Sequence, residues 1–385
     1  MKSFPTTLLQ SSALRTLFAI AISTMFLSSC KKEANPPQES DRPGPLTQTN
    51  ERTGFFNTRV SPGGSIQAAV DAAHPGFIIM IDAGIYNEAV VVNKPGILLV
   101  GATDGVIIQN PGGKENGVTA TDLADGFVLK NLTVRNFEEN GVYLDHVNGF
   151  LLSNVTTINN GEYGLFPVFS TNGIIEHCSA SGHSDTGIYV GQSSNVSISN
   201  NVVTANVNGL EVENSKNVVV AKNQSYDNVA GLLVILLPGL EVKSASDVLV
   251  FKNNIFNNNH TNFAPPGGGF ESIIPKGVGI LVLGADRTKI TENNIYNNDF
   301  TGIAVVSTAV LGSLAGLPPS AFADIEPNPD GNQILKNVLT HNGTAPTPGF
   351  PFPGVDLLWD GTGTGNCWSL NTFSTLYPSP LPTCN

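Results

Sequence analysis

The amino-acid sequence predicts an all-β fold: a single solenoid of the parallel β-helix type, with a short N-terminal capping helix and irregular C-terminal coils. Three observations support this prediction. A Gly followed by an apolar residue recurs at a nearly constant spacing, short stretches alternate between apolar and polar residues, and Asn recurs at fixed distances from the Gly. A constant period of about 20 to 50 residues is typical of repeat architectures, and alternation at period two is typical of strands.

The repeated unit is 22 to 24 residues long. Each unit contains three short strand-like stretches and no helical periodicity, which favours a coil of three strands stacked on the next coil. The repeats begin at Gly117, Gly141, Gly164, Gly187, Gly209 and Gly231, and resume at Gly279 and Gly302.

Asn provides an independent test of the repeat. The 385 residues include 41 Asn and 40 Gly, whereas only 13% are charged. Asn131, Asn154, Asn201 and Asn223 each follow their repeat Gly by 13 or 14 residues. Asn tolerates the left-handed backbone of tight turns, and stacked Asn side chains can form amide ladders. Both roles agree with a solenoid.

The N-terminal end of the repeats has the pattern of a capping helix. In Ser65-Ile66-Gln67-Ala68-Ala69-Val70-Asp71-Ala72-Ala73 the apolar residues have helical spacing, and Ser65 is suited to be the N-cap. This opening and the repeats together resemble the pectin-lyase-like superfamily, which implies a right-handed parallel β-helix. The segment from Ala180 to Ser193 is similar to bacterial parallel β-helix repeat lipoproteins. This second resemblance implies a fold and a location rather than a reaction.

The first thirty residues have the pattern of an export signal. Lys2 and Arg15 precede an apolar run over 17–27, which is too short to span a bilayer. The run ends in Leu27-Ser28-Ser29-Cys30, which resembles the lipobox of bacterial lipoproteins. The resemblance implies cleavage before Cys30 and acylation of its thiol, so that the membrane is a partner through a lipid anchor.

Four segments follow from these patterns. We expect a signal peptide over 1–29, a Pro-rich disordered tether over 30–53, and a β-helix domain over 54–385. The regular coils should span about 105–310, and the looped C-terminal part 311–385. The protein is then exported and lipid-anchored in the bacterial cell envelope, at the outer membrane.

Export also affects the expected state of the cysteines. Cys367 and Cys384 both lie in the irregular C-terminal part, and an oxidising compartment favours a disulfide between them. Cys178 lies at a repeat position, where we expect a buried free thiol.

Three acidic residues precede the repeat Gly by two positions in successive coils: Glu139, Glu162 and Asp185. Because neighbouring coils lie about 4.8 Å apart, these residues should form one column of like charge. A cation such as Ca²⁺, a shared proton or splaying into solvent would relieve the repulsion. The column therefore predicts a metal or proton-transfer site. The alternative is a structural column, since turn residues of a β-helix are often acidic.

The strand beside the column has outward positions that suit a sugar chain. Aromatic rings stack on pyranose faces, and carboxylates bond to sugar hydroxyls or transfer protons. We expect substrate-binding positions at Tyr143, Asp145, Phe166, Tyr189, Gln192 and Glu211, with Glu213 beside Asp145 in the next outward row.

The candidate catalytic residues are His183, Asp185 and Glu162, with His183 expected on the same edge as the acids. Known catalytic motifs do not transfer intact. Tyr143-Leu144-Asp145-His146 is similar to a pectate lyase segment, but the Arg-x-Pro-x-x-Arg segment that supplies the base in those enzymes is missing. The outward positions from Tyr143 to Glu213 also offer no Lys or Arg base beside the acids. This favours binding, epimerisation by His183 or acid-catalysed hydrolysis over lyase chemistry.

Charge and loops complete the functional hypothesis. The net charge of −12 argues against nucleic-acid binding, which needs a basic face. Two insertions, 238–245 and 260–276, interrupt the coils, and solenoid insertions often emerge on the binding face. We expect a monomeric envelope lipoprotein that binds or processes an extracellular polysaccharide. The alternative is a non-catalytic envelope scaffold or binding module.

Overall fold

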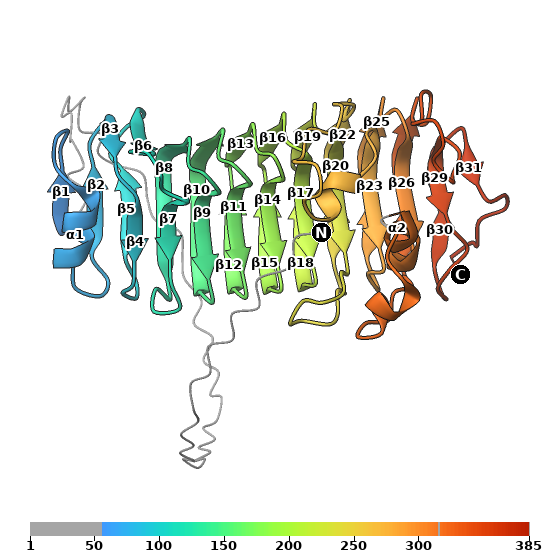
Figure 1. Ribbon diagram of the computed structural model, residues 1–385, viewed down its shortest axis with the longest axis horizontal. Coiled ribbons are helices and arrows are strands. Elements are labelled where there is room, and N and C mark those ends of the chain that lie inside the picture. The colour runs from blue at the N-terminus through green and yellow to red at the C-terminus, as the bar shows by residue number, and fades with distance from the viewer. Residues whose placement is uncertain (1–55, 315, 385) are drawn as a thin grey trace, which may run out of the picture. The chain divides into compact units, whose positions relative to one another are not determined.

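The computed structural model describes residues 56–314 and 316–384, which form a parallel β-helix (Figure 1). Its strands lie in an 11-stranded sheet and a 20-stranded sheet, and the paired strands run parallel throughout the described ranges. One coil consists of β14 (Thr186–Gly191) in the first sheet, followed by β15 (Ser194–Ser199) and β16 (Val202–Thr204) in the second. The predicted fold class and its three strands per coil are confirmed.

The 11-stranded sheet positions the candidate site, and its order follows the chain from one end to the other. Its remaining strands are β4 (Val90–Val92), β7 (Asn116–Ala120), β9 (Asn140–Asp145), β11 (Tyr163–Val168), β17 (Asn208–Glu213), β20 (Ala230–Ile235), β23 (Val278–Leu283), β26 (Thr301–Val306), β29 (Val355–Trp359) and β31 (Leu376–Tyr377).

The 20-stranded sheet forms the other two sides of each coil. Besides β15 and β16 it contains β1 (Thr58–Val60), β2 (Ile78–Ile81), β3 (Gly84–Asn87), β5 (Leu98–Gly101), β6 (Val106–Gln109), β8 (Phe127–Arg135), β10 (Asn148–Ile158), β12 (Thr171–Glu176), β13 (Ser179–Ser181), β18 (Lys216–Ala221), β19 (Gln224–Tyr226), β21 (Leu249–Phe251), β22 (Asn254–Phe256), β24 (Lys289–Thr291), β25 (Asn294–Tyr296), β27 (Gln333–Leu335), β28 (Val338–Thr340) and β30 (Cys367–Ser369).

The core lies between the sheets and is built from columns of identical register. Leu165 pairs with Ile188, Ile188 with Leu210, and Leu210 with Leu232, and all four side chains are fully buried. Because side chains alternate along a strand, the residue that follows each of these four on its own strand points outward. The period-two pattern of the sequence therefore separates an aliphatic interior from an outer face that is free to vary.

Buried Asn side chains form two ladders through the interior. In the first ladder the backbone N–H and Nδ2 of Asn201 both donate to Oδ1 of Asn223, at 2.9 Å each. In the second, Asn206 donates in the same way to Asn228, and Asn228 to Asn258. Each amide thus satisfies backbone groups that turns would otherwise leave unpaired inside the protein.

The Asn spacing has a second origin in the turns. Asn131 and Asn154 have φ values of 58° and 54°, which is the left-handed region. Both side chains are outside the core, and Nδ2 of Asn154 donates to Oδ1 of Asn131 at 3.2 Å. The regular Asn pattern therefore combines interior ladders with exposed left-handed turns.

Both ends of the solenoid are closed by the chain itself. The predicted helix is α1 (Ile66–Ala72), whose N-cap Ser65 accepts a hydrogen bond from the Ala68 N–H at 3.1 Å, and whose Ile66 and Val70 are buried. At the other end Cys367 and Cys384 form a disulfide. Cys178 is a buried free thiol, and burial raises its pKa to about 12.

Three short helical elements interrupt the later coils: η1 (Phe270–Ile273), α2 (Thr308–Leu314) and η2 (Pro319–Phe322). None of the helices in the described ranges is long and apolar enough to cross a membrane. The expected signal peptide, the tether and Cys30 lie outside the described residues.

Replacing Asn228 by Ala should lower the free energy of unfolding by about 1–3 kcal/mol, because the Asn206 N–H and the Val203 carbonyl lose their partner inside the protein. Urea unfolding of both proteins measures the difference. Asn294→Ala is the matched control, since this exposed side chain has a bond to Asn254 alone, and it should cost less than about 0.5 kcal/mol. Equal losses for the two variants would contradict a stabilising role for the ladder.

Candidate functional site

The strand register brings the predicted outward residues into rows. Tyr143 pairs with Phe166 across β9 and β11, and Tyr189 pairs with Glu211 across β14 and β17. Gly191 pairs with Glu213 in the next outward row. The rows therefore lie where the sequence places them, on the outer face of the 11-stranded sheet.

Three carboxyl groups are packed together on this face: Asp185, just before β14, and Glu211 and Glu213 of β17. We call them the buried acid group, because Glu211 is 5% and Glu213 8% exposed. Two side chains bridge Asp185 and Glu211. Thr186 Oγ1 lies 3.0 Å from Asp185 Oδ1 and 2.5 Å from Glu211 Oε2, and Asn208 Nδ2 lies 3.4 Å and 3.1 Å from the same oxygens.

The bridging hydroxyl can bond to both carboxyls at once if one of them is protonated. Thr186 Oγ1 carries one hydrogen, so it can donate to one carboxyl only. The second contact is a hydrogen bond only if the other carboxyl is protonated and donates to Oγ1. Like charges at this distance in a desolvated site favour such an arrangement.

Burial is the main cause of perturbed ionisation here. Burial, with the nearby Glu213 charge, raises the pKa of Glu211 to about 8, and burial raises the pKa of Glu213 to about 7. Burial and then the Glu211 charge also raise the pKa of Asp185 well above its usual value. The group is therefore partly protonated near neutral pH and can both donate and accept protons.

Glu213 is held by a tyrosine. Tyr189 Oη donates to Glu213 Oε1 at 2.6 Å, and the ring is buried. Gly191 leaves the space that this hydroxyl occupies, since a Cβ at that position would lie 2.0 Å from Tyr189 Oη. The Gly in this outward position therefore permits the Tyr–Glu contact.

A pocket of about 310 Å³ adjoins the buried acid group. Its sheet-side wall is Glu162, Tyr163, Ser184 and Asp185, and its other wall is the glycine-rich insertion between β22 and β23, through Pro265, Gly268, Gly269 and Glu271. We call this space the acid pocket. The insertion 260–276 thus lies on the face where a binding loop is expected.

The loop wall is anchored by its own hydrogen bonds. Asn262 Nδ2 donates to the backbone carbonyls of Glu271 and Ile274, at 2.7 Å and 3.0 Å. The Gly269 N–H donates to Glu271 Oε1 at 2.6 Å. These contacts place a fourth carboxylate, Glu271, opposite Asp185.

The predicted column is stacked through its backbone but not through its carboxylates. The Glu162 N–H donates to the Glu139 carbonyl at 2.7 Å, and the Asp185 N–H to the Glu162 carbonyl at 3.1 Å. The side chains then separate, because Asp185 turns toward Thr186 and Glu211 whereas Glu162 remains exposed. Over the described ranges, these three do not form a trio of ligand atoms within 4.8 Å of one another. Within the described residues the expected Ca²⁺ column of Glu139, Glu162 and Asp185 is therefore not assembled as one ligand set, although burial raises the pKa of all three carboxyls and the Glu139 charge raises that of Glu162 further.

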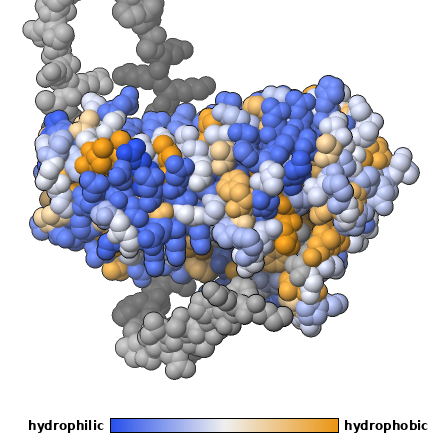
Figure 2. Space-filling view, turned by 45° about the horizontal axis from the view of Figure 1, so that its top comes forward, coloured by the Kyte–Doolittle hydropathy of each residue, from blue (hydrophilic) through white to orange (hydrophobic). Residues whose placement is uncertain are grey.

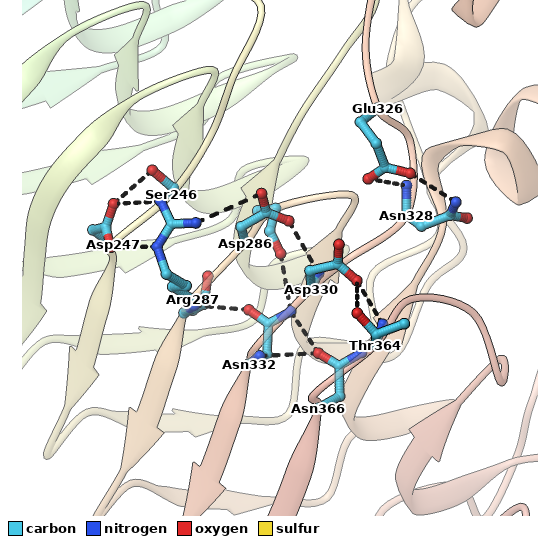
Figure 3. A network of polar contacts seen from close by, with 12 residues as sticks. Ser246, Asp247, Asp286, Arg287, Glu326, Asn328, Asp330, Asn332, Thr364 and Asn366 are labelled. Carbon is cyan, nitrogen blue, oxygen red and sulfur yellow. Dashed lines mark hydrogen bonds and ion pairs between the residues drawn. The ribbon is translucent and has the colours of Figure 1, made fainter.

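The trio that meets this distance lies elsewhere and was not predicted: Asp286, Glu326 and Asp330 (Figure 3). Asp286 Oδ1 accepts the Asp330 N–H at 3.0 Å, and Asp330 Oδ1 accepts the Thr364 N–H and hydroxyl. Glu326 accepts from the backbone and side chain of Asn328. These bonds join turns of adjacent coils, and the cluster has the character of a loop-stabilising network.

His183 is not on the edge with the acids, and this expectation is wrong. The side chain is completely buried, with its ring nitrogens 3.2 Å from Thr157 Oγ1 and from the Asn160 carbonyl. Burial lowers the pKa of His183 to about 4. His183 replaces an Asn in the second ladder, since its N–H donates to Asn206 Oδ1 at 3.1 Å. An interior imidazole has no access to a substrate, so His183 has no place in a catalytic set.

Of the remaining predicted residues, some lie beside the acid pocket and others make contacts elsewhere in the structure. Tyr143 and Phe166 stack with ring centroids 5.4 Å apart and lie half-buried beside the acid pocket. Asp145 is paired with His146 at 2.6 Å, away from the buried acid group. Gln192 does not face a ligand: its Oε1 accepts the N–H groups of Glu241 and Val242 and fixes the insertion 238–245.

Four further side chains contribute to the site and were not predicted: Tyr163, Thr186, Asn208 and Glu271. Thr186 and Asn208 directly precede the repeat Gly in their coils, so the register that identified Glu211 also identifies them. Tyr163 stacks on Phe166 at 4.3 Å and occupies the same position one coil earlier. Glu271 belongs to the insertion, and no repeat pattern assigns its place.

Residues 116–273 match the family model of the right handed beta helix region. No curated protein matches the chain. Among solved structures, the A-module of a mannuronan C-5 epimerase from Azotobacter vinelandii is similar, with 17% identity, a TM-score of 0.56, and coverage of 80% of this chain and 95% of that one.

Two further structures share the fold. DFA-IIIase from Arthrobacter chlorophenolicus A6 has 13% identity and a TM-score of 0.53, covering 83% of this chain and 80% of that one. Tailspike protein 2 of bacteriophage CBA120 has 10% identity and a TM-score of 0.55, covering 78% and 44%. Such identities establish the fold alone. The chain has the right-handed parallel β-helix fold.

The free energy of unfolding should fall as the pH rises from about 5 to about 8. Glu211 and Glu213 hold protons up to pKa values of about 8 and 7 in the folded chain, whereas an unfolded Glu has a pKa of about 4.3. The folded state then binds more protons across this window, so raising the pH destabilises it. Urea unfolding at several pH values measures the slope.

The double variant Glu211→Gln and Glu213→Gln should flatten this pH dependence, because neither side chain titrates. Glu292→Gln is the control, since Glu292 is an exposed partner of Lys252 at 3.5 Å, and it should keep the wild-type slope. A double variant with the wild-type slope would show that the buried acid group does not retain protons.

Proposed function

We propose that the protein is a lipid-anchored envelope protein that binds and processes an extracellular polysaccharide in the acid pocket. The observation that carries the proposal is the pair of carboxyls Asp185 and Glu211 bridged by Thr186, of which Asp185 lines a pocket walled by further carboxyls and a Tyr ring. The similar structures named mannuronan C-5 epimerase and DFA-IIIase support a carbohydrate ligand on this fold.

The arrangement suits acid catalysis on a glycosidic bond. A protonated carboxyl donates to the leaving oxygen, and a second carboxyl stabilises the developing positive charge or activates water. Asp185 is the member of the pair that touches the pocket, so it is the residue placed to donate. Glu211 and Thr186 hold the proton on the pair, and Glu162 and Glu271 are the carboxyls nearest to a second role.

Aromatic rings extend the site along the sheet toward β9. Tyr163 lines the acid pocket, and Phe166 and Tyr143 continue the stack. Half-buried rings next to carboxyls give a surface that is apolar enough to pack a sugar ring and polar enough to bond its hydroxyls. This combination favours a polymer of several units over a small isolated ligand.

Purified protein should bind one member of a polysaccharide panel and release new reducing ends from it. Asp185→Asn should retain binding but lose at least about 100-fold in rate, the usual contribution of a general acid. Asp71→Asn is the control, because Asp71 lies on α1 at the N-terminal end of the solenoid, and it should match wild type. Binding without new ends in the wild type would favour a non-catalytic binding module, and no binding to any member would contradict the proposal.

The lipid anchor is tested separately. Cys30→Ser removes the thiol that the lipobox-like segment presents for acylation, so the full-length protein should lose labelling by a fatty-acid analogue and leave the membrane fraction. Cys178→Ser is the matched control and should remain labelled. Equal labelling of wild type and Cys30→Ser would contradict the anchor without affecting the pocket.

A further inference from the structure

The outer face of the 11-stranded sheet changes character along the rod. Over β9 and β11 its outward side chains, such as Tyr143, Asp145 and Phe166, are half-buried and open to solvent. From β20 to β29 these outward side chains are apolar and at most 7% exposed: Leu233, Ile235, Leu281, Leu283, Ala304, Val306 and Leu358. The second half of this face is therefore covered.

The cover comes from the later insertions. Phe270 of η1, Val310 of α2, Phe350 and Phe352 pack on these outward positions as a second apolar cluster. Figure 1 shows α2 in front of β26, and Figure 2 shows apolar side chains gathered at lower right, where the C-terminal coils lie. A polymer lying along the sheet cannot pass through this packed layer.

One insertion of the cover, 238–245, is anchored at several points. Gln192 and Asn214 bond the backbone of the insertion 238–245. Lys243 and the Gly239 N–H of that insertion both contact Asp324, next to η2. These contacts hold the insertion 238–245, whose Leu240 packs against the second apolar cluster.

The acid pocket lies at the boundary between the open and covered halves. Glu162, just before β11 on its sheet side, is exposed, whereas Tyr189 of β14 and Glu211 of β17, one and two strands further on, are buried. Pro265, Gly268, Gly269 and Glu271 form the wall of the pocket that the sheet does not supply. A chain that enters over β9 and β11 meets buried outward positions from Tyr189 onward, so the open part of the face ends beside Asp185.

The charge of the pocket limits what can end there. Its described lining includes Glu162, Asp185 and Glu271 and no Lys or Arg. Lys276, on the same insertion, is paired with Asp299 at 3.1 Å. An acidic sugar would meet carboxylates without a compensating cation, whereas hydroxyl groups of a neutral sugar can both donate and accept there.

We propose that the acid pocket takes the terminal unit of a neutral polysaccharide chain, so that the protein recognises chain ends rather than chain interiors. This inference rests on the proposed carbohydrate function and adds to it the polarity of the substrate and the mode of binding. It follows from the closed end of the face and from the uncompensated carboxylates.

The test compares chain lengths of one polymer at equal mass. Dextran, levan and xylan serve as neutral probes, alginate and polygalacturonate as acidic ones, all with the wild-type protein in calcium-free buffer. For the neutral polymer that binds, partial depolymerisation to chains ten times shorter creates ten times more ends. Affinity per unit mass should then rise about tenfold, while affinity per mole of chain stays constant.

Other outcomes separate this inference from the proposed function. Affinity per unit mass that does not change with chain length would overturn end recognition, while polysaccharide binding itself would stand. Binding confined to alginate or polygalacturonate would overturn the assignment to a neutral chain. Failure of all five polymers to bind would count against the proposed function and the inference together.

Discussion

Every coil must match the coils on either side of it, because backbone hydrogen bonds between parallel strands fix both their spacing and their register. A residue in one coil therefore lies directly above its counterpart in the next. Aliphatic side chains gain from this stacking, as do amides, which can donate and accept along the axis. Carboxylates do not, and they must be separated, exposed or protonated. The buried acid group is the consequence of this constraint on a face from which water has been removed.

The fold could be predicted because the constraint acts identically in each coil. The Gly–apolar pairs, the alternation of β14 and β17 and the capping residue Ser65 each report a local requirement that the sequence states directly. The rows of Tyr143, Phe166, Tyr189 and Glu211 followed from the same register. Because all coils share the strand register, aligning the repeats was enough to assign a side chain to the inner or the outer face.

The candidate site was predicted less well because side-chain direction and insertions depend on the tertiary environment. Glu162 and Asp185 are equivalent in the repeat, but Asp185 turns inward to Thr186 and Glu211 and Glu162 does not. His183 was expected to be a partner of Asp185 because the two are near in sequence. It follows Gly164 by 19 residues, just as Asn206 follows Gly187 by 19 residues, and this offset is that of the interior ladder. Glu271 reaches the site on an insertion, which has no repeat to align.

Cys178 marks a change in how the rod is held together. Its column begins with Leu132 and Val155, passes through the thiol, and continues as Asn201, Asn223 and Asn253. The earlier coils therefore cohere at this column through dispersion and apolar burial, and the later ones through a relay of amides. The acid pocket lies at this junction, because its lining residues Ser184 and Asp185 follow Cys178 in the chain.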